Sequence, residues 1–451
     1  MYKKKLNFLL IVVLIGALAL TGCSAAETVT APPAESTAVP SSSGETPTEV
    51  AAPTQPQEMT TIQFMQWWGT EGDVGKSLDG LVADFEDENP NIKVELVSLP
   101  FGDTKTQIVA NHVAGTIADV IGVNPPWTRE FYDLGILEPL DNYMANDAGF
   151  NKADYFPASM TPIDGKTYLA PYNTLTFLLY YNIDMFESAG LEVPQNWNDI
   201  LTAASALTDV DNNKYGFTLS LSEAGAANGS ILSLYPLLYA ANGRTLVDGK
   251  YNAETPEMIA AMKLLSDLSA AGSIVPGENV KNDAMMVEEF SLGNVGMMIQ
   301  SDAHVASLAV SNPDLNYGVI PIPSPDGNGK PELRHHGWDL AMTAKGKNKE
   351  AAWKFISFLL QRDNMERAGI EMHKTPSMFG IAVADGASEP EKMVREYMST
   401  YNMVEELMSM PKAGACWEQL TKAGVYVLKG EKTPEQALAD TQTEWNSILE
   451  Q

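Results

Sequence analysis

The chain has 451 residues, and its 58 acidic side chains outnumber its 29 lysines and arginines, which gives a net charge of −29 at pH 7. This charge disfavours binding to nucleic acids, which depends on clustered lysine and arginine, and adsorption to anionic lipid. The cysteines and histidines show no zinc-binding spacing, and the adjacent pair His335-His336 would face opposite ways on a strand, so we expect neither a metal nor a cofactor.

The N-terminus has the parts of a secretory signal. Lysines occupy positions 3–5, an apolar run extends from Phe8 to Leu20, and Leu20-Thr21-Gly22-Cys23 follows. The run is shorter than the roughly 18 apolar residues that a spanning helix needs, so residues 1–22 are predicted to be a removable leader. The four residues that close it resemble a bacterial lipobox, and this resemblance implies cleavage before Cys23 and lipidation of its thiol.

A linker is predicted to follow the leader. Residues 23–58 are rich in Pro, Ser, Thr, Ala and Glu and contain almost no large apolar side chains. Such a segment cannot bury enough surface to offset the entropy of ordering it, so we expect it to be disordered. The folded part then starts near Met59 and is long enough for two domains with large cores. We expect the mature protein outside the cytoplasm, attached to the bacterial cell membrane through Cys23 alone.

The folded part opens with a strand, a helix and a second strand. Apolar and polar residues alternate over Thr61–Gln66 as in a strand, and apolar residues recur at helical spacing over Leu78–Phe85. Asn89-Pro90 ends this helix, and alternation returns over Ile92–Leu96. This βαβ pattern predicts two parallel strands joined by a right-handed crossover.

Aromatic residues follow the ends of two predicted strands. A second helix is predicted over Thr104–Ala114 and a buried third strand over Asp119–Val123. Trp67-Trp68 follows the carboxyl end of the first strand, and Asn124–Trp127 follows that of the third. Because ligands bind beyond the carboxyl ends of the strands in open parallel sheets, we expect three tryptophans to converge at a binding edge.

Strands and helices alternate through the rest of the chain, which predicts an α/β fold with two lobes. The predicted strands are Leu175–Tyr181, Tyr215–Leu219, Gly296–Ile299, Tyr317–Ile322 and Leu340–Met342. The predicted helices start at or contain Asn182–Asp184, Trp197–Leu207, Leu234–Ala241, Pro256–Ala271, Lys349–Leu360 and the capping box Thr433–Gln436.

Several motifs, in their order and spacing, resemble the extracellular solute-binding proteins of the sugar type, the family that includes the maltose-binding protein. The resemblance covers Met59–Gln451, and most of its motifs are packed turns or helix ends that identify the fold. They are Phe85-x-x-x-Asn89-Pro90, Gly115-Thr116-x-x-Asp119-Val120, Gly135-x-Leu137-x-Pro139-Leu140-Asp141, Asp164-Gly165-Lys166-x-Tyr168, Tyr181-Asn182, Ala189-Gly190-Leu191-x-x-Pro194, Phe290-x-x-Gly293, Tyr317-Gly318-Val319, Ala351-Ala352-Trp353-Lys354-Phe355 and Gly430–Ala439.

The resemblance implies a periplasmic-binding-protein-like fold with a hinge and a ligand cleft between two lobes. Residues 59–172 and 341–372 would form the first lobe, and residues 177–336 and 377–451 the second. The chain would cross between them near 173–176, 337–340 and 373–376. The implied function is that of a monomer without catalysis, which captures a carbohydrate and delivers it to the permease subunits of an ABC transporter.

A sugar site needs aromatic rings for the apolar faces and polar side chains for the hydroxyls. The aromatic candidates, from their strand ends or from family positions, are Trp67, Trp68, Trp127, Trp338 and Trp417. Trp67 and Trp68 are adjacent, so one ring is expected in the cleft and the other in the core. The polar candidates are Glu71, Asn124, Asn173, Ser301, Asp302 and Asp339.

Two other classes of function stay open at this point. A secreted glycoside hydrolase also surrounds a sugar with carboxylates and aromatic rings, but it needs two carboxylates flanking one bond, about 5.5 or 6.5–9.5 Å apart. Here the acids are scattered along the sequence, and no nucleophile or phosphate-binding motif is present. Within the binding class, the solute could also be a polyamine or a ferric ion, to which the tyrosine pair Tyr180-Tyr181 points.

Overall fold

The computed structural model describes residues 58–222 and 226–450. The predicted leader, the predicted lipidation site Cys23 and almost all of the predicted linker lie outside these residues. In the part of the chain that the structure describes, no helix combines the length and the apolar character needed to cross a membrane.

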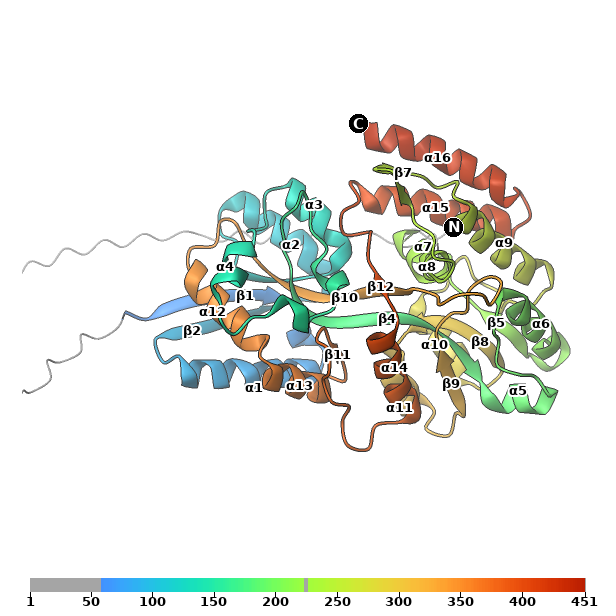
Figure 1. Cartoon of the computed structure of the whole chain (residues 1–451), viewed down its shortest axis with the longest axis horizontal. Coiled ribbons are helices and arrows are strands. Elements are labelled where there is room, and N and C mark those ends of the chain that lie inside the picture. Colours follow the sequence, from blue (N-terminus) through green and yellow to red (C-terminus); the bar gives the residue numbers. More distant parts are fainter. Residues whose placement is uncertain (1–57, 223–225, 451) are drawn as a thin grey trace, which may run out of the picture. The chain divides into compact units, whose positions relative to one another are not determined.

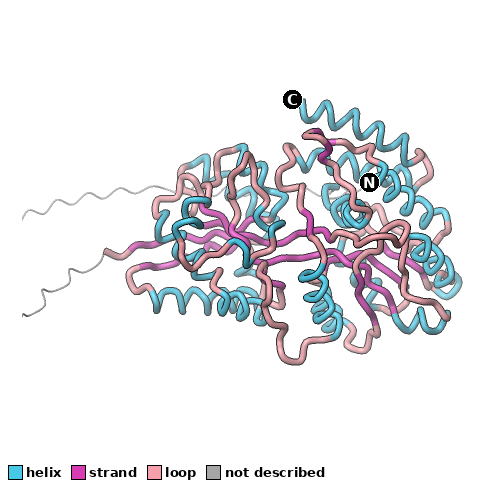
Figure 2. Tube along the Cα trace, in the orientation of Figure 1, coloured by secondary structure: helices cyan, strands magenta, loops and turns pink. Residues whose placement is uncertain are grey.

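A sheet of ten strands runs through the described structure, and helices cover it on both sides (Figure 2). Its main path has the order β2-β1-β3-β10-β4-β8-β5, and β9, β11 and β12 pair with β4 or β10. The strands are β1 (Thr60–Gln66), β2 (Ile92–Ser98), β3 (Val120–Val123), β4 (Ala170–Asn182), β5 (Tyr215–Thr218), β8 (Val295–Ser301), β9 (Tyr317–Ile320), β10 (Leu333–Met342), β11 (Thr375–Pro376) and β12 (Met403–Val404). A separate small hairpin consists of β6 (Leu246–Val247) and β7 (Lys250–Tyr251).

Helices and short 3-10 turns connect these strands (Figure 1). The helices are α1 (Asp73–Glu88), α2 (Phe101–Ala114), α3 (Thr128–Asp133), α4 (Asp141–Asn146), α5 (Ile183–Ala189), α6 (Trp197–Leu207), α7 (Ala226–Ser233), α8 (Tyr235–Ala240), α9 (Pro256–Ala270), α10 (Asp283–Ser291), α11 (His304–Ser311), α12 (Lys349–Leu359), α13 (Arg362–Glu371), α14 (Glu389–Thr400), α15 (Ala413–Leu428) and α16 (Pro434–Glu450). The 3-10 turns are η1 (Trp68–Thr70), η2 (Pro125–Trp127), η3 (Lys152–Asp154), η4 (Pro157–Met160) and η5 (Val210–Asn212).

The first strands confirm the predicted βαβ unit. β1 pairs in parallel with β2 along its whole length, and α1 connects them. The helix buries the predicted apolar face from Leu78 to Phe85, and it ends at Asn89, whose side-chain amide donates to the carbonyl of Phe85. β1 also pairs in parallel with β3, so the loops after β1 and β3 leave the same edge of the sheet. The predicted capping box at α16 is confirmed too, since Thr433 and Gln436 exchange hydrogen bonds.

β4 and β10 run side by side through the middle of the sheet (Figure 1). β4 has 13 residues, and its first half pairs antiparallel with β10 from Thr176↔His335 to Ala170↔Leu340. On its other side, β11 pairs with the same stretch at Asn173 and Thr174. The three segments that the sequence analysis assigned to crossings are therefore neighbouring strands.

β10 is longer than predicted, because only Leu340–Met342 had an apolar strand pattern. The preceding residues include Arg334, His335 and Asp339, all of them buried. Their polar groups are partly satisfied inside the protein: His335 lies within hydrogen-bond distance of two hydroxyls, 3.1 Å from that of Ser159. Burial lowers the pKa of His335 to about 3, so its ring is neutral. A buried strand with this composition gives no alternating signal in the sequence.

Large buried clusters of apolar side chains lie on either side of the paired crossings. One combines residues 62–172 with 340–381 and Met408. Another combines residues 177–322 with 404–445, and a smaller third one packs around Leu178, Tyr180 and Phe290. This is the expected two-lobed α/β fold, while the exact limits of the lobes stay a prediction.

Candidate ligand-binding site

The aromatic residues predicted at the edge of the sheet are in contact. Trp67 ends the segment after β1, and its ring centre lies 5.8 Å from that of Trp68 and 5.4 Å from that of Trp127, which closes η2 after β3. The predicted convergence of three tryptophans is thus confirmed. Trp338 of β10 joins them with its ring centre 5.6 Å from that of Trp67, which brings four of the predicted aromatic residues into one cluster.

Neither Trp67 nor Trp68 is exposed to solvent. Their exposed fractions are 1% and 0%. The prediction that one ring lies in the cleft and the other in the core is therefore wrong, because both rings are buried. The physical reason is that β1 ends at Gln66 and the 3-10 turn η1 starts at Trp68, so the chain bends between the two residues. Trp68 stacks on Tyr172, with 5.1 Å between ring centres and 11° between planes.

A groove of about 510 Å³ opens beside this cluster. One wall comes from α2, η2 and α3, and the opposite wall comes from α7, α15 and the segment before α15. The predicted residues Asn124 and Trp127 line the first wall, and the predicted Trp417 lines the second. The two walls belong to the two large apolar clusters, so this groove corresponds to the cleft expected between the lobes.

Several buried polar atoms around the groove and the aromatic cluster have no hydrogen-bond partner in the described residues. Buried polar groups in folded proteins are normally hydrogen-bonded to protein or water, so unpaired ones need an explanation. These atoms are Asn124 Oδ1, Trp417 Nε1, Trp68 Nε1, Tyr172 OH and Asp339 Oδ2. Their concentration here indicates a place where water or a solute completes the hydrogen bonding.

Two predicted polar residues, Asn173 and Asp339, form hydrogen bonds between β4 and β10. Asn173 Oδ1 accepts a hydrogen bond of 2.8 Å from the backbone N–H of Trp338. Asp339 Oδ1 accepts one of 3.3 Å from the backbone N–H of Tyr172. Burial raises the pKa of Asp339 well above its ordinary value. Both side chains connect β4 to β10.

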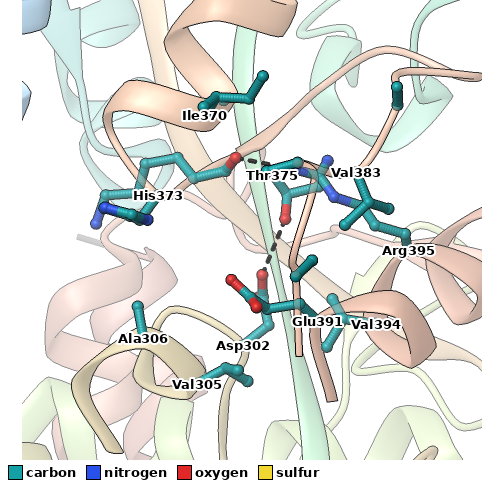
Figure 3. A pocket seen from close by; sticks show the side chains of 15 residues that line it. Asp302, Val305, Ala306, Ile370, His373, Thr375, Val383, Glu391, Val394 and Arg395 are labelled. Atoms are coloured by element: carbon teal, nitrogen blue, oxygen red, sulfur yellow. Dashed lines mark hydrogen bonds between the residues drawn. The ribbon is translucent and has the colours of Figure 1, made fainter. Parts of the chain in front are cut away.

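Ser301 and Asp302 lie apart from the groove, at the end of β8. Asp302 lines a second, smaller cavity of about 60 Å³ that shares no lining residue with the groove. Figure 3 shows Asp302 bonded to Thr375, with Arg395 and Glu391 of α14 on one side and His373 opposite. Asp302 also accepts a hydrogen bond of 2.7 Å from the backbone N–H of Thr176, so it holds the crossing strands.

Glu71 is half-buried beyond η1, near the charge of Lys374. The ammonium of Lys374 lies 4.3 Å from the ring centre of Trp338. Burial raises the pKa of Glu71, and the positive charge of Lys374 offsets part of this rise. Glu71 is therefore next to the aromatic cluster without lining the groove.

Sequence reasoning missed a group of charged and polar residues on the second-lobe side. Arg334 of β10, Tyr239 of α8 and Glu405 after β12 are all buried and lie within electrostatic reach of one another. They are far apart in the chain, and no local pattern marks them. A charged residue inside a segment that also carries a histidine pair is the one signal that could have drawn attention to Arg334.

Raising the pH from about 4 to 7 is expected to destabilise the protein through Asp302. Burial raises the pKa of this carboxyl from 3.8 to about 6, although hydrogen bonds and Arg395 oppose the shift. Because the folded state holds the proton more tightly than the unfolded state, the stabilisation is complete below about pH 3.8 and is lost as the pH rises through about 6. The shift corresponds to at most about 3 kcal/mol.

Urea denaturation of the wild type and Asp302→Asn across this pH range measures the effect. The variant cannot lose a proton at this position, so its stability should fall less with rising pH than that of the wild type. Equal pH slopes for the two proteins would contradict the prediction.

The chain is similar to known binding proteins over most of its folded part. A family model described as bacterial extracellular solute-binding protein matches residues 68–366. A putative binding protein of Brucella abortus is 30% identical over 282 residues, which are 62% of this chain and 67% of that protein. The sn-glycerol-3-phosphate-binding periplasmic protein UgpB of Escherichia coli is 26% identical over 434 residues, covering 87% of this chain and 93% of that protein.

Solved structures give the same picture of the fold. A solute-binding protein of an ABC transporter from Thermotoga lettingae, bound with alpha-D-tagatose, superposes with a TM-score of 0.70 at 26% identity, covering 87% of this chain and 100% of that chain. The sugar-binding protein MalE of Xanthomonas citri superposes with a TM-score of 0.74 at 21% identity, covering 86% and 97%. The second likeness concerns the fold alone.

Proposed function

The chain belongs to the bacterial extracellular solute-binding proteins, and from that premise we propose that it captures a carbohydrate between its lobes and delivers it to the permease subunits of an ABC transporter. The groove with Asn124, Trp127 and Trp417 is the observation that supports this most directly. Ligand pockets usually have volumes of about 300–1,000 Å³, with an apolar lining and a few placed polar groups. A groove of about 510 Å³ with tryptophan on both walls fits that description.

The chemistry of the walls favours a sugar over other small solutes. Trp127 and Trp417 can cover the apolar faces of a sugar ring, because aromatic rings are flat and largely apolar. Asn124 Oδ1 and the indole N–H of Trp417 lack partners in the described structure, and they are an acceptor and a donor that hydroxyl groups can satisfy. The similar solute-binding protein from Thermotoga lettingae, whose structure is bound with alpha-D-tagatose, also supports a sugar as the ligand.

We further propose that the lobes comprise residues 59–172 with 341–372 and residues 177–336 with 377–451, and that they close by hinge bending at 173–176, 337–340 and 373–376. The side-by-side pairing of these three segments supports the hinge. Hinges absorb conformational change in a few residues at the ends of strands or in loops. We also propose that the protein acts as a monomer.

We propose that the protein has no catalytic activity. Glycoside hydrolases place two carboxylates on either side of the bond that breaks. Among the described residues that line the groove, the carboxylates are Glu130 and Asp133. Both belong to α3, so they stand on one wall and do not flank a ligand. The relatives named above are binding proteins as well.

A thermal-shift screen tests the proposed function. A solute that binds only the native state raises the melting temperature, because it stabilises by RT ln(1 + [L]/Kd). The panel should hold mono- and oligosaccharides, with spermidine and ferric ion as the competing solutes, and chromatography of the incubated oligosaccharides should detect cleavage. A shift by spermidine or ferric ion alone, or the appearance of cleaved sugar, would overturn the proposal.

Replacing Trp127 with alanine is expected to weaken binding of the sugar found in that screen by about tenfold or more, which corresponds to about 1.4 kcal/mol. The ring forms part of the groove wall, and aromatic contacts contribute roughly 0.5–1.5 kcal/mol beyond the burial of area. Calorimetric titration measures the affinity. Tyr426→Ala removes an exposed ring of α15 and serves as the matched control. Unchanged affinity in the Trp127 variant would place the site elsewhere.

We propose that the mature protein is held at the bacterial cell membrane by a lipid on Cys23. The motif Leu20-Thr21-Gly22-Cys23 supports this, and stable anchoring of this kind needs two or more acyl chains. Cys23→Ser is expected to release the protein from the membrane fraction of expressing cells, whereas Cys416→Ser, at a buried cysteine of α15, should stay with it. Retention of both variants would rule out lipidation at Cys23 as the attachment.

A further inference from the structure

Arg334 carries a buried guanidinium that has no hydrogen-bond partner among the described residues. Its side chain lies in β10 with an exposed fraction of 1%. The guanidinium carbon lies 4.6 Å from the ring centre of Phe177, so one flat face of the group is covered. None of the nitrogens Nε, Nη1 and Nη2 has a hydrogen-bond partner among the described residues.

A guanidinium stays charged in proteins and carries five N–H donors in a fixed plane. Leaving such a group buried without acceptors is strongly unfavourable. The native protein must therefore supply oxygen acceptors in the plane of Arg334, and since no described side chain or carbonyl provides them, they come from solvent or from a solute.

The surroundings of Arg334 offer a complementary set of polar groups. Tyr239 of α8 is fully buried, and its hydroxyl has no partner in the described residues. The carboxylate of Glu405 interacts electrostatically with Arg334 but is too far away for a direct ion pair. Its Oε1 accepts from the backbone N–H groups of Leu407 and Met408, while no described donor reaches Oε2. The N–H donors of Arg334, the hydroxyl of Tyr239 and Oε2 of Glu405 are thus left for water or a solute to satisfy.

The segment that follows β12 extends from these polar residues to the groove. The carbonyl of Glu405 accepts a hydrogen bond from Thr161, and that of Ser409 accepts one from Arg129 of α3. Thr161 and Arg129 belong to the part of the chain proposed as the first lobe. The next residue, Met410, lines the groove itself. The segment from Glu405 to Met410 therefore follows the boundary between the lobes from Arg334 to the groove wall.

We propose that Arg334 and Glu405, with the hydroxyl of Tyr239, form a polar subsite that binds hydroxyl groups of an uncharged sugar. This inference rests on the proposed function and specifies the ligand. A sugar hydroxyl accepts a hydrogen bond and donates one, so neighbouring hydroxyls can accept from Arg334 and donate to Glu405. Above about pH 7, where the carboxyl of Glu405 is mostly ionised, an acidic sugar would fit poorly, because its charge would add to that of Glu405 and exceed what Arg334 can balance. The net charge of −29 opposes anionic solutes further.

The test uses the full mature chain with Arg334→Met, Arg334→Lys and Glu405→Gln. The probes are uncharged mono- and oligosaccharides, each beside its uronic acid or phosphate ester. For the uncharged sugar that binds the wild type, calorimetry should give an affinity lowered about 100-fold by Arg334→Met, as expected for two charge-assisted hydrogen bonds. Glu405→Gln should lower it about tenfold, and Arg334→Lys should recover only part of the loss, because an ammonium lacks the planar fork.

Arg362→Met is the matched control, because Arg362 is exposed and donates to the carbonyl of Phe379 far from the subsite; its affinity should equal that of the wild type. Wild-type affinity in Arg334→Met would overturn the inference. Tighter binding of the wild type to the acidic member of a pair than to the uncharged member would also overturn the inference. That result would not contradict the proposed carbohydrate binding.

A second measurement needs no ligand. Burial raises the pKa of Glu405 to about 7, so this carboxyl is mostly protonated at about pH 6 and does not balance the charge of Arg334. At this pH, ligand-free Arg334→Met should melt at or above the wild-type temperature, because the variant lacks the buried, unpaired guanidinium. A clearly lower melting temperature would assign Arg334 a structural role and overturn the inference. If no sugar of the panel binds the wild type, the proposed function fails instead, and with it the sugar specificity inferred here.

Discussion

Replacing Trp68 with alanine is expected to lower the free energy of unfolding by about 3–5 kcal/mol, the range for truncating a buried tryptophan. The ring has no exposed surface. Its centre lies 5.6 Å from that of Phe64, 5.8 Å from that of Trp67, 5.1 Å from that of Tyr172 and 6.1 Å from that of Trp338. These neighbours belong to different strands and turns, so they cannot collapse together into the space that the ring leaves.

Denaturant unfolding of Trp68→Ala and Trp127→Ala measures this effect. Trp127 is 9% exposed and forms a wall of the groove, so water can occupy the space after truncation, and its loss of stability should be smaller. Domains are typically stable by about 5–15 kcal/mol, so both variants should still fold. Equal losses would show that the groove wall is packed as tightly as the centre of the cluster.

Replacing Asp119 with alanine is expected to lower the free energy of unfolding by about 3–5 kcal/mol. Its Oδ2 accepts a hydrogen bond of 3.1 Å from the backbone N–H of Gln63, and its Oδ1 accepts from those of Lys347 and Asn348 at 2.8 and 2.9 Å. Hydrogen bonds to a charged group contribute about 1.5–3 kcal/mol each. The carboxylate also stands before the positive N-terminus of α12. One side chain therefore holds β1, β3 and α12 together.

The control is Asp267→Ala, which removes an exposed carboxylate paired with Lys263 one helical turn away. Pairs of this kind contribute about 0.5 kcal/mol or less, so its unfolding curve should nearly match that of the wild type. Asp119→Asn keeps an acceptor oxygen and should fall between the two. A small loss in Asp119→Ala would mean that water replaces the carboxylate at these backbone groups.

The sequence predicted the elements whose physics is local. Alternation marked β1 and β2, helical spacing marked α1, and Thr433 with Gln436 marked the start of α16. The first half of β10 had no such signal, because Arg334 and His335 are both buried, and the hydroxyl within hydrogen-bond distance of His335 comes from Ser159, far away in the chain. Where burial depends on long-range polar contacts, the composition of a strand resembles that of a loop.

Some residues of the candidate site were predictable from the sequence in the same way, and others were not. Trp67 and Trp127 could be predicted from the sequence to lie close together, because strand direction decides which loops share an edge of a sheet. Trp417 was named through family position, and it lines the groove. Arg334 and Glu405 could not be paired from the sequence, since 71 positions separate them and only the folded chain brings β10 close to the segment after β12.

The strand order also decides when the chain can fold during its synthesis. β10 lies between β3 and β4 in the sheet, but it is made long after both. Until residue 342 has left the ribosome, β3 and β4 each lack a neighbour, and the sheet remains in two unfinished parts. Pairing that waits for such distant segments is slow. The strand order therefore keeps the sheet incomplete until most of the chain has been translated, which leaves time for the chain to cross a membrane before it folds.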